Sequence, residues 1–386
     1  MKAKSIAGNT PEKIKIALEK SMEDGFKPNL GVVFISIKQD WREVNSVLCE
    51  SSINVIGTSS SGEFINGRQS EGGIVIMLID IHPNSYHILF KDIGKNDIVT
   101  ASIELANDIK NTFDDPQLIL LGTGFNSKGG MLEGDKLIHS IKEVLGEKVR
   151  LFGAMAGDDM IFEGSRVFTK DDHTDHGMAV LVLDGSKISI QGMAISGWKP
   201  FGIYRTITKS EGNLVYTIDD KPALEMYLQY LGHEITSEED KWNFFNTIGT
   251  HYPIQIERED RVPMICNPIG HDQEKDALVM EANVPQGARF RFSFPPDFDI
   301  AETIVEKAQE MKNRASEKAE ALLIFSCLGR LSALGPMAQD ENEGLAEVWE
   351  VPMAGFYSYG EFGNGENGKL EYHSTTNSWV IIKDKK

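Results

Sequence analysis

Three segments of this chain repeat one order of elements: an apolar run, a helical stretch, a glycine turn and a second apolar run. The opening runs are LGVVFISI at 30–37, LILLGTGF at 118–125 and ALLIFSCLG at 321–329. Continuous apolar strands that alternate with helices are typical of sheets covered on at least one face. We therefore predict an α/β (α+β) fold in which duplicated strand–helix–strand half-domains form mixed sheets covered by helices.

The region between the second and third repeats has a different character. From about Lys187 to Phe298 it is rich in aromatic residues and proline, and its segment 276–295 is typical of a β-hairpin. A chain of 386 residues is long for one compact core, so two domains are expected. We predict an N-terminal domain over 1–200 and a C-terminal domain over 201–386, with the boundary in the stretch 187–212.

The turns inside the repeats are similar to one another. They are IGTSSSGEF (56–64), FGAMAGDDM (152–160) and GFYSYGEFG (355–363), and each carries Gly-Glu or Gly-Asp. Glycine at a strand end permits close backbone approach, and exposed N–H groups there bind carboxylate or phosphate. Because α/β proteins bind ligands at the carboxyl edge of their strands, the turns predict a small-ligand pocket.

The serine-rich turn at 57–62 resembles two enzyme motifs, and neither is complete. In a P-loop the position of Glu63 is a lysine, and a carboxylate there would repel phosphate. In a hydrolase elbow the second glycine follows the serine after one residue, but here Ser61 stands in that place and Gly62 comes one residue late. The remaining interpretation is a hydroxyl-rich turn that offers donors and acceptors to a polar ligand.

Other reactive residues are isolated in the sequence. Cys327 ends an apolar run with no histidine nearby, so a buried thiol is favoured over a nucleophile, whereas Arg330 is a suitable forked donor to a ligand carboxylate. The segment DDHTDHG (171–177) fits no recognised metal spacing and is interpreted as an acidic solvated loop. Any one of His233, His251 and His271 is a candidate axial haem ligand, although lone histidines are more often hydrogen-bonded or exposed.

Charge and cysteine content limit the partners and the compartment. The formal net charge of −19 argues against a nucleic-acid partner, which requires a concentrated basic face. No apolar run reaches about 18 residues, so no membrane span is expected. Three widely spaced cysteines and the lack of a signal-peptide pattern at the N-terminus predict a cytoplasmic protein without disulfides.

Taken together, these stretches resemble the FIST family, a sensory module with N-terminal and C-terminal halves, here as a stand-alone bacterial member. The N-terminal half matches in VIGTSSSGEF and FGAMAGDD. The C-terminal half matches in VYTIDDKPALEMYLQYLG, ANVPQGARFRFSF, LLIFSCLGR and GFYSYGEFG, so the resemblance runs from about residue 30 to the end. HSTTNSW (373–379) departs from the common His-Asn-type segment, which puts a direct role for His373 in doubt.

The resemblance implies a non-enzymatic sensor of a small, amino-acid-like ligand that signals through a partner such as a histidine kinase or another signalling protein. It also implies an alternative, a haem protein that senses nitric oxide and modulates a histidine kinase. A Cys- or Ser-dependent enzyme is the third hypothesis. In the first hypothesis Glu63 or Glu361 accepts from a ligand amine and Arg330 donates to its carboxylate. The predicted ligand-binding residues are Gly57, Ser59, Ser60, Gly62, Glu63, Cys327, Arg330, Tyr357, Tyr359, Gly360 and Glu361.

Overall fold

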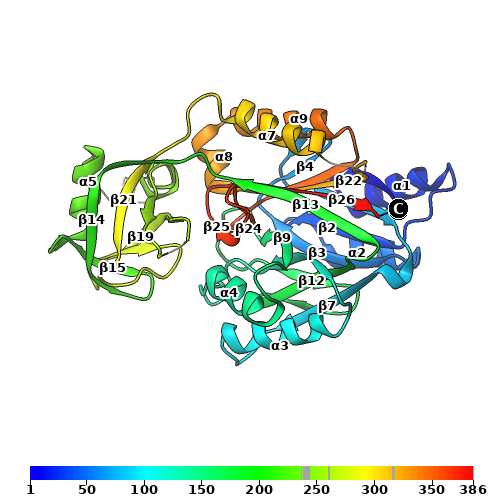
Figure 1. Ribbon diagram of the computed structural model, residues 1–386, viewed down its shortest axis with the longest axis horizontal. Helices are drawn as coiled ribbons and strands as arrows, with labels where there is room; N and C mark the ends of the chain where they lie inside the picture. The colour runs from blue at the N-terminus through cyan, green and yellow to red at the C-terminus, as the bar shows by residue number, and fades with distance from the viewer. Residues whose placement is uncertain (236, 238–243, 260, 315–317, 386) are drawn as a thin grey trace.

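The computed structural model of the protein describes residues 1–235, 237, 244–259, 261–314 and 318–385. Three related α/β units form one body, and a β-rich domain is inserted into the third unit (Figure 1). This confirms the predicted mixed α/β fold with helix-covered sheets. Within the described residues, every helix is too short or too polar to cross a membrane.

Each unit repeats one order of elements, a strand, a helix, a strand, a helical segment and four more strands. In the first unit these are β1 (Lys2–Gly8), α1 (Pro11–Met22), β2 (Leu30–Ser36), α2 (Trp41–Glu50), β3 (Asn54–Ser60), β4 (Glu63–Ile65), β5 (Arg68–Ser70) and β6 (Ile74–Asp80). In the second they are β7 (Tyr86–Asp92), α3 (Ile98–Lys110), β8 (Pro116–Gly122), α4 (Gly134–Leu145), β9 (Arg150–Met155), β10 (Val167–Thr169), β11 (His173–Thr174) and β12 (Gly177–Asp184).

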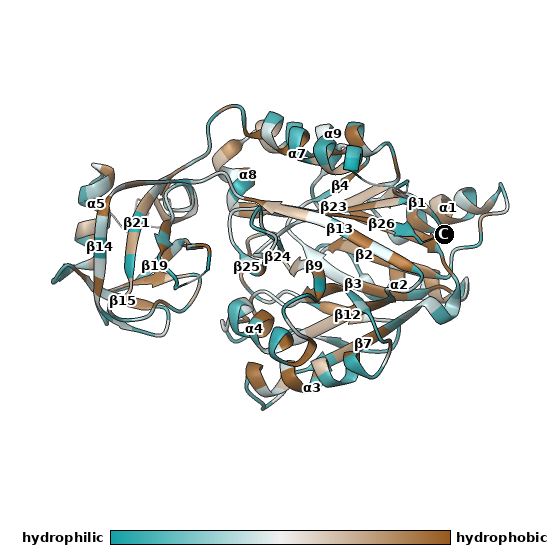
Figure 2. Ribbon diagram, in the orientation of Figure 1, coloured by the Kyte–Doolittle hydropathy of each residue, from teal (hydrophilic) through white to brown (hydrophobic). Residues whose placement is uncertain are grey.

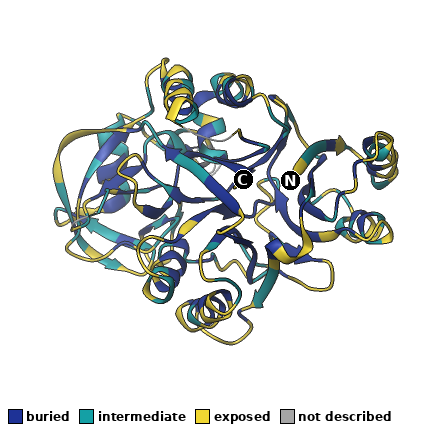
Figure 3. Cartoon of the chain, turned by 45° about the vertical axis from the view of Figure 1, so that its right-hand side comes forward, coloured by how far each residue is buried: buried dark blue, intermediate teal, exposed yellow. Residues whose placement is uncertain are grey.

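The third unit begins with β13 (Ile188–Ile195) and resumes after the insertion. Its later elements are α7 (Ile300–Arg314), β22 (Ala321–Cys327), α8 (Leu328–Leu334), α9 (Met337–Trp349), β23 (Met353–Ser358), β24 (Glu361–Asn364), β25 (Leu370–His373) and β26 (Asn377–Asp384). The Met1 ammonium pairs with Asp384, so the two chain ends lie side by side (Figure 3).

The three sheets of the body have equivalent strand orders. These are β1-β6-β2-β3-β10-β11, β7-β12-β8-β9-β24-β25 and β13-β26-β22-β23-β4-β5. In each, two parallel strands lie at the centre (β2 and β3, β8 and β9, β22 and β23). After each glycine turn the chain leaves its own sheet: β4 joins the third sheet, β10 the first and β24 the second. The units are therefore interlocked by exchanged strands.

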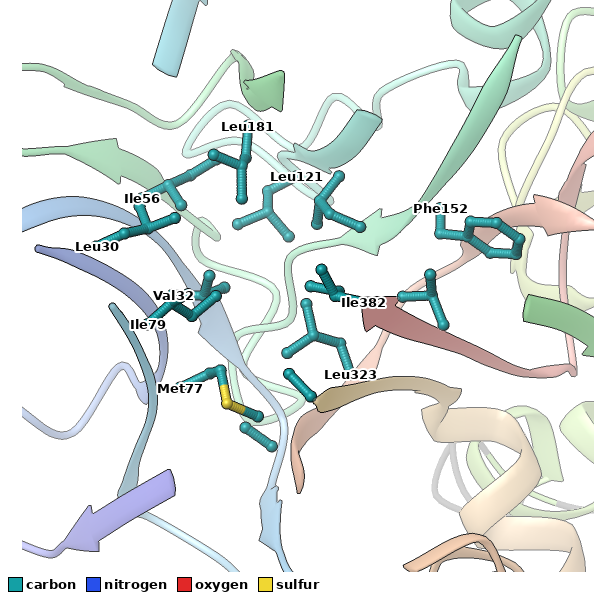
Figure 4. Packing of buried hydrophobic residues seen from close by; sticks show 14 of the residues in the cluster. Leu30, Val32, Ile56, Met77, Ile79, Leu121, Phe152, Leu181, Leu323 and Ile382 are labelled. Carbon is teal, nitrogen blue, oxygen red and sulfur yellow. The ribbon is translucent and has the colours of Figure 1, made fainter. Parts of the chain in front are cut away.

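One core lies where the three sheets face each other. Figure 4 shows side chains that converge there from all three sheets, among them Leu30, Val32, Ile56, Leu121, Phe152, Leu181, Leu323 and Ile382. Each side chain of this size stabilises the fold by roughly 1.5–3 kcal/mol when it is fully buried. On the outer faces, α1 and α2 cover the first sheet, α3 and α4 the second, and α7 and α9 the third. These helices are amphipathic and expose their polar faces (Figures 2 and 3).

The inserted domain is built around one bent sheet with its own core. Two segments connect it to the body, one from β13 into the insertion and one leading out to α7 (Figure 1). Its elements are β14 (Lys199–Glu211), β15 (Leu214–Ile218), β16 (Lys221–Pro222), α5 (Ala223–Leu231), the π-helical turn η2 (Phe245–Gly249), β17 (Ile254–Ile256), β18 (Met264–Cys266), β19 (Pro268–Asp272), β20 (Ala277–Met280) and β21 (Arg289–Phe294).

The prediction of a β-hairpin at 276–295 is wrong, because its two strands do not pair with each other. Strands β20 and β21 both form there, but β20 pairs with β15 and β19, whereas β21 pairs with β14 and β17. Between them lie β14 and β15, which close a tight hairpin of their own at Gly212. Because β20 pairs with β15 and β21 pairs with β14, this local hairpin separates β20 from β21 and prevents them from pairing with each other.

Candidate functional site

The first glycine of the first and third predicted turns serves the packing between units. The ring of Phe168 lies over Gly57, and the ring of Phe64 lies over Gly355. A Cβ atom would come within 2.3 Å of Phe168 at position 57 and within 2.1 Å of Phe64 at position 355. Both aromatic residues sit on exchanged strands of another unit or sheet, so the glycines make room for the exchange.

The second glycine of the first and third turns is explained by its backbone conformation. Gly62 has φ +113° and Gly360 has φ +152°, in the region that favours glycine. The Tyr372 ring would also lie 2.6 Å from a Cβ atom at position 360. Tyr357 packs over Gly62 and donates from its hydroxyl to Gln69 at 2.5 Å. The glycines of the turn motif therefore allow the chain to pass from one sheet to the next.

The two motif glutamates are buried and bonded inside the protein. Glu63 accepts from the Ser60 hydroxyl at 2.5 Å and from the Gly73 N–H at 2.9 Å. Glu361 repeats the arrangement, with the Ser358 hydroxyl at 2.7 Å and the Thr376 hydroxyl at 2.6 Å. Burial raises the pKa of Glu63 to about 7 and the pKa of Glu361 to about 8, although these hydrogen bonds oppose the shift.

The acid of the second turn plays a different part. Glu63 and Glu361 are the first residues of the exchanged strands β4 and β24. The exchanged strand after the second turn, β10, begins only at Val167, so Asp158 lies in the loop before it. Its carboxylate accepts from the N–H groups of Glu163 and Gly164 and from the Tyr359 hydroxyl at 2.5 Å. Asp158 therefore folds the loop 158–164 back onto the third unit.

The serine hydroxyls of the first turn also hold the chain together. Ser59 donates to the Gly157 carbonyl at 2.6 Å and accepts from the Arg166 N–H at 2.8 Å. Ser61 accepts from the Asp159 N–H at 3.0 Å. These bonds join the first turn to the second, and none of them involves a histidine that could act as a base.

Arg330 is fully buried, and its guanidinium is bonded within the protein. Its Nε and Nη2 bond both oxygens of Glu341, with contacts of 2.6–3.1 Å. Its Nη1 donates to the carbonyls of Thr375 (3.0 Å) and Ser196 (2.5 Å). Because Ser196 begins the connection into the inserted domain, Arg330 fixes that connection to the body.

A half-enclosed cavity of about 430 Å³ lies between the body and the inserted domain. It is at the carboxyl ends of β22 and β23, where ligands bind in open α/β sheets. Of the predicted residues, Cys327 and Tyr359 line it. Ser59 lines a different cavity, Arg330 is buried in α8, and the others are buried at the strand crossings. The body contributes Phe125, Met131, Met160, Phe162, Cys327, Leu328, Gly329, Leu331, Ser332, Ser358 and Tyr359, and the inserted domain contributes Phe245, Thr250, Asn267, Ile269 and Glu281.

The polar floor of this cavity comes from residues that sequence reasoning missed. Glu281 accepts from the N–H of Asn267 at 2.8 Å and from its Nδ2, which also donates to Ser374 of the body. Burial raises the pKa of Glu281 to about 6, against these hydrogen bonds. Among the described residues, the buried Oδ1 of Asn267 has no hydrogen-bond partner. The polar floor thus combines a carboxylate with an amide whose buried oxygen lacks a partner among the described residues.

Aromatic rings form the opposite wall. Phe162 stacks on Tyr359 with ring centroids 5.7 Å apart, and Phe125 meets both edge-on at 5.2 and 5.8 Å. Phe162 and its neighbour Met160 are more than 40% exposed and have positive φ, which is uncommon for such side chains. The loop therefore holds large apolar side chains toward an open cavity instead of a packed core.

Ion pairs clamp the inserted domain onto the body beside this cavity. Arg261 binds the buried Glu371 through two nitrogens and also reaches Asp135 at 2.7 Å. Arg258 adds contacts to Asp135 at 3.0 Å and to Glu371 at 3.5 Å. Trp198 donates from Nε1 to the His251 carbonyl at 3.0 Å. These contacts join the inserted domain to the body in the arrangement that the structure shows.

Cys327 should react slowly with alkylating agents, because burial and the neighbouring Glu361 and Glu281 raise the pKa of its thiol well above the ordinary value. We expect iodoacetamide at pH 7.5 to modify Cys327 more than about tenfold more slowly in the folded protein than in guanidinium. Mass spectrometry of the digested protein measures this. Equal rates in both states would reveal a reactive thiol and would support the enzyme hypothesis.

The histidines considered as haem ligands lie outside the cavity lining. His233 stacks on Phe244, His251 bonds the Ser332 hydroxyl at 3.2 Å, and His271 bonds Asp276 at 3.0 Å. His373 bonds the Gly363 carbonyl at 3.0 Å. Within the described parts of the chain, no three His, Cys, Asp or Glu side chains are grouped to hold a metal ion. None of the three candidate histidines is therefore placed among the described lining residues of this cavity.

Comparison with known proteins gives two results. Residues 29–221 match the model of the FIST N domain and residues 223–364 match that of the FIST C domain, so two sequence domains meet near residue 222. The boundary we predicted at residue 200 lies earlier in the chain and stays a prediction. An uncharacterized protein of Methanocaldococcus jannaschii, MJ1623, is 24% identical over 344 residues, which are 80% of this chain but only 64% of that protein.

Proposed function

Because the chain belongs to the FIST family, whose domains are sensory and bind small ligands in signalling, we propose that it senses a small molecule in the interdomain cavity. The observation that carries this proposal is the pairing of an apolar, half-enclosed cavity with a polar floor contributed by the other domain. Ligand sites are commonly concave, mostly apolar and located at domain interfaces.

The charges of the lining favour a ligand that carries an amine. Glu281 is the carboxylate in the lining, and neither lysine nor arginine is among the described lining residues. The Oδ1 of Asn267 adds an acceptor that has no donor among the described residues. An ammonium group offers three donors and a positive charge, and the aromatic wall accommodates an apolar body. We therefore propose an amine with an apolar side chain, which includes amino-acid-like ligands.

Ligand binding would be signalled by a change in the arrangement of the two domains. A ligand that touches both Glu281 of the insertion and Tyr359 of the body contacts the two walls at once. It would favour the domain arrangement in which both walls reach it, since a ligand shifts an equilibrium by its differential affinity. A histidine kinase or another signalling protein would recognise that arrangement. This partner is our proposal from the family relationship.

Phenethylamine should bind the protein, and its carboxylate analogue 3-phenylpropionate should not, because only the amine complements Glu281. Glu281→Gln should weaken amine binding by about tenfold or more, since hydrogen bonds to a charged group contribute roughly 1.5–3 kcal/mol. Amine binding should also weaken below pH 6, as Glu281 becomes protonated. Isothermal titration calorimetry at pH 5, 6 and 7.5 measures all three effects.

The control for this experiment is Glu274→Gln, which removes the same charge from an exposed position of the inserted domain. It should leave the affinity for phenethylamine unchanged. Equal affinity for the amine and the acid, or full affinity in Glu281→Gln, would refute the amine site.

A further inference from the structure

A second cavity, of about 410 Å³, lies in the first unit at the carboxyl ends of β2 and β3. This is the edge that corresponds to β22 and β23 in the third unit, where the interdomain cavity lies. The two cavities share no lining residue, but the loop after β9 reaches both: Met160 and Phe162 line one, and Gly164 and Arg166 line the other.

The lining of this second cavity is basic, in contrast to the whole chain. Lys38, Arg42 and Arg166 line it, whereas the chain has a formal net charge of −19. Within the part of the chain that the structure describes, neither guanidinium forms an ion pair. Lys38 lies 3.8 Å from Asp159, which also accepts from the Ser36 hydroxyl at 2.6 Å. Asp40, the acid in the lining, accepts from the Arg42 N–H as the N-cap of α2.

An aromatic side chain brings the two arginines together. The Arg42 Cζ lies 4.8 Å and the Arg166 Cζ lies 5.8 Å from the Trp41 ring centroid. Arg166 is half-buried, and its pKa is lowered by burial and then by the charge of Arg42. The carboxylate of Asp175 offsets part of the charge of Arg166. The remaining repulsion between the two like charges is relieved when an anion binds to both of them.

We propose that this cavity binds the phosphate group of a small molecule, which Arg42 and Arg166 grip with their guanidinium forks and Lys38 contacts from the β2 side. Planar guanidinium groups match the oxygen geometry of phosphate. Three cations also favour a doubly charged phosphate over a singly charged carboxylate as the ligand. The Ser59 and Gln39 side chains also lie in the lining, where they bond the Gly157 and Gly72 carbonyls and fix the shape of the cavity. The site is independent of the amine cavity, so either proposal can fail without the other.

The proposal is tested with inorganic phosphate, pyrophosphate and adenosine monophosphate by isothermal titration calorimetry in low-salt buffer at pH 7.5. We expect binding of both inorganic anions, weakened about tenfold or more in Arg166→Gln and in Arg42→Gln. If adenosine monophosphate binds more tightly than phosphate, the ligand is a nucleotide whose nucleoside part adds contacts in or beside the cavity. If it binds equally, the phosphate group alone accounts for recognition.

Matched controls keep this result interpretable. Arg314→Gln removes the same charge from the exposed end of α7 and should bind phosphate like the unmodified protein. Arg42 is exposed, so Arg42→Gln is expected to fold even if the half-buried Arg166→Gln does not, and thermal melts verify folding in each case. Undetectable phosphate and pyrophosphate binding, or binding that a folded Arg42→Gln variant retains in full, would overturn the proposal.

Discussion

Replacing Arg330 by methionine should destabilise the protein by about 3–5 kcal/mol, the usual effect of removing one partner of a buried ion pair. Among the residues that the structure describes, the Asn377 amide at 3.2 Å is then the remaining donor to the fully buried Glu341. It also removes the donors to the carbonyls of Ser196 and Thr375. Urea denaturation of the variant, followed by circular dichroism, measures the loss.

Two further variants separate the buried charge from a general effect of losing an arginine. Arg314→Met removes an exposed arginine that is paired with Glu310 at 3.5 Å, and it should change the stability by less than about 1 kcal/mol. Adding Glu341→Gln to Arg330→Met should restore part of the stability, because the uncompensated buried charge is then removed. A loss below about 1 kcal/mol for Arg330→Met would show that its bonds in the structure contribute little.

The stability of the protein should fall as the pH rises from 5 to 8, and Glu361→Gln should remove much of that fall. Burial raises the pKa of Glu361 from its ordinary 4.5 to about 8, so the folded state binds this proton more tightly than the unfolded state. The stabilisation is therefore complete below pH 4.5 and is lost as the pH approaches 8. At about 1.4 kcal/mol per pKa unit, this group accounts for a change of about 3–5 kcal/mol.

Glutamine has the shape of a protonated glutamate and does not ionise, so Glu361→Gln should be more stable than the unmodified protein at pH 8 and about equal at pH 5. Denaturant titrations at pH 5, 6, 7 and 8 measure the two curves. Some pH dependence should remain from Glu63, whose pKa is raised to about 7 by burial. Glu302→Gln, at an exposed position of α7, is the control and should leave the curve unchanged. Parallel curves for Glu361→Gln would contradict the buried-acid assignment.

Local structure was largely predictable from the sequence. Thr10 followed by Pro11 is typical of a helix start, and α1 begins there, with the Thr10 side chain accepting from the Lys13 N–H. The apolar runs at 30–37, 118–125 and 321–329 also located the central strands β2, β8 and β22. These features depend on residues that are near each other in the chain, where capping and periodicity act directly.

Pairing across long distances was not predictable in the same way. The sequence suggested a hairpin at 276–295, and nothing in it indicated that β4, β10 and β24 exchange between sheets. Such exchange depends on which surfaces meet, for example the Phe64 ring over Gly355. A repeated glycine motif is compatible with a ligand-binding turn as well as with a strand crossing, and only packing distinguishes them.

The sequence by itself determined that this chain consists of repeated α/β units whose turns carry glycine and a carboxylate, because hydrophobic periodicity and glycine positions are local properties. Only the tertiary structure decided what those turns do. It buried Glu63, Glu361 and Arg330 among internal partners and brought Glu281 of the insertion opposite Tyr359 of the body. A side chain becomes part of a site through its neighbours in space, and those neighbours are more than a hundred residues away in the chain for Arg330 and Ser196.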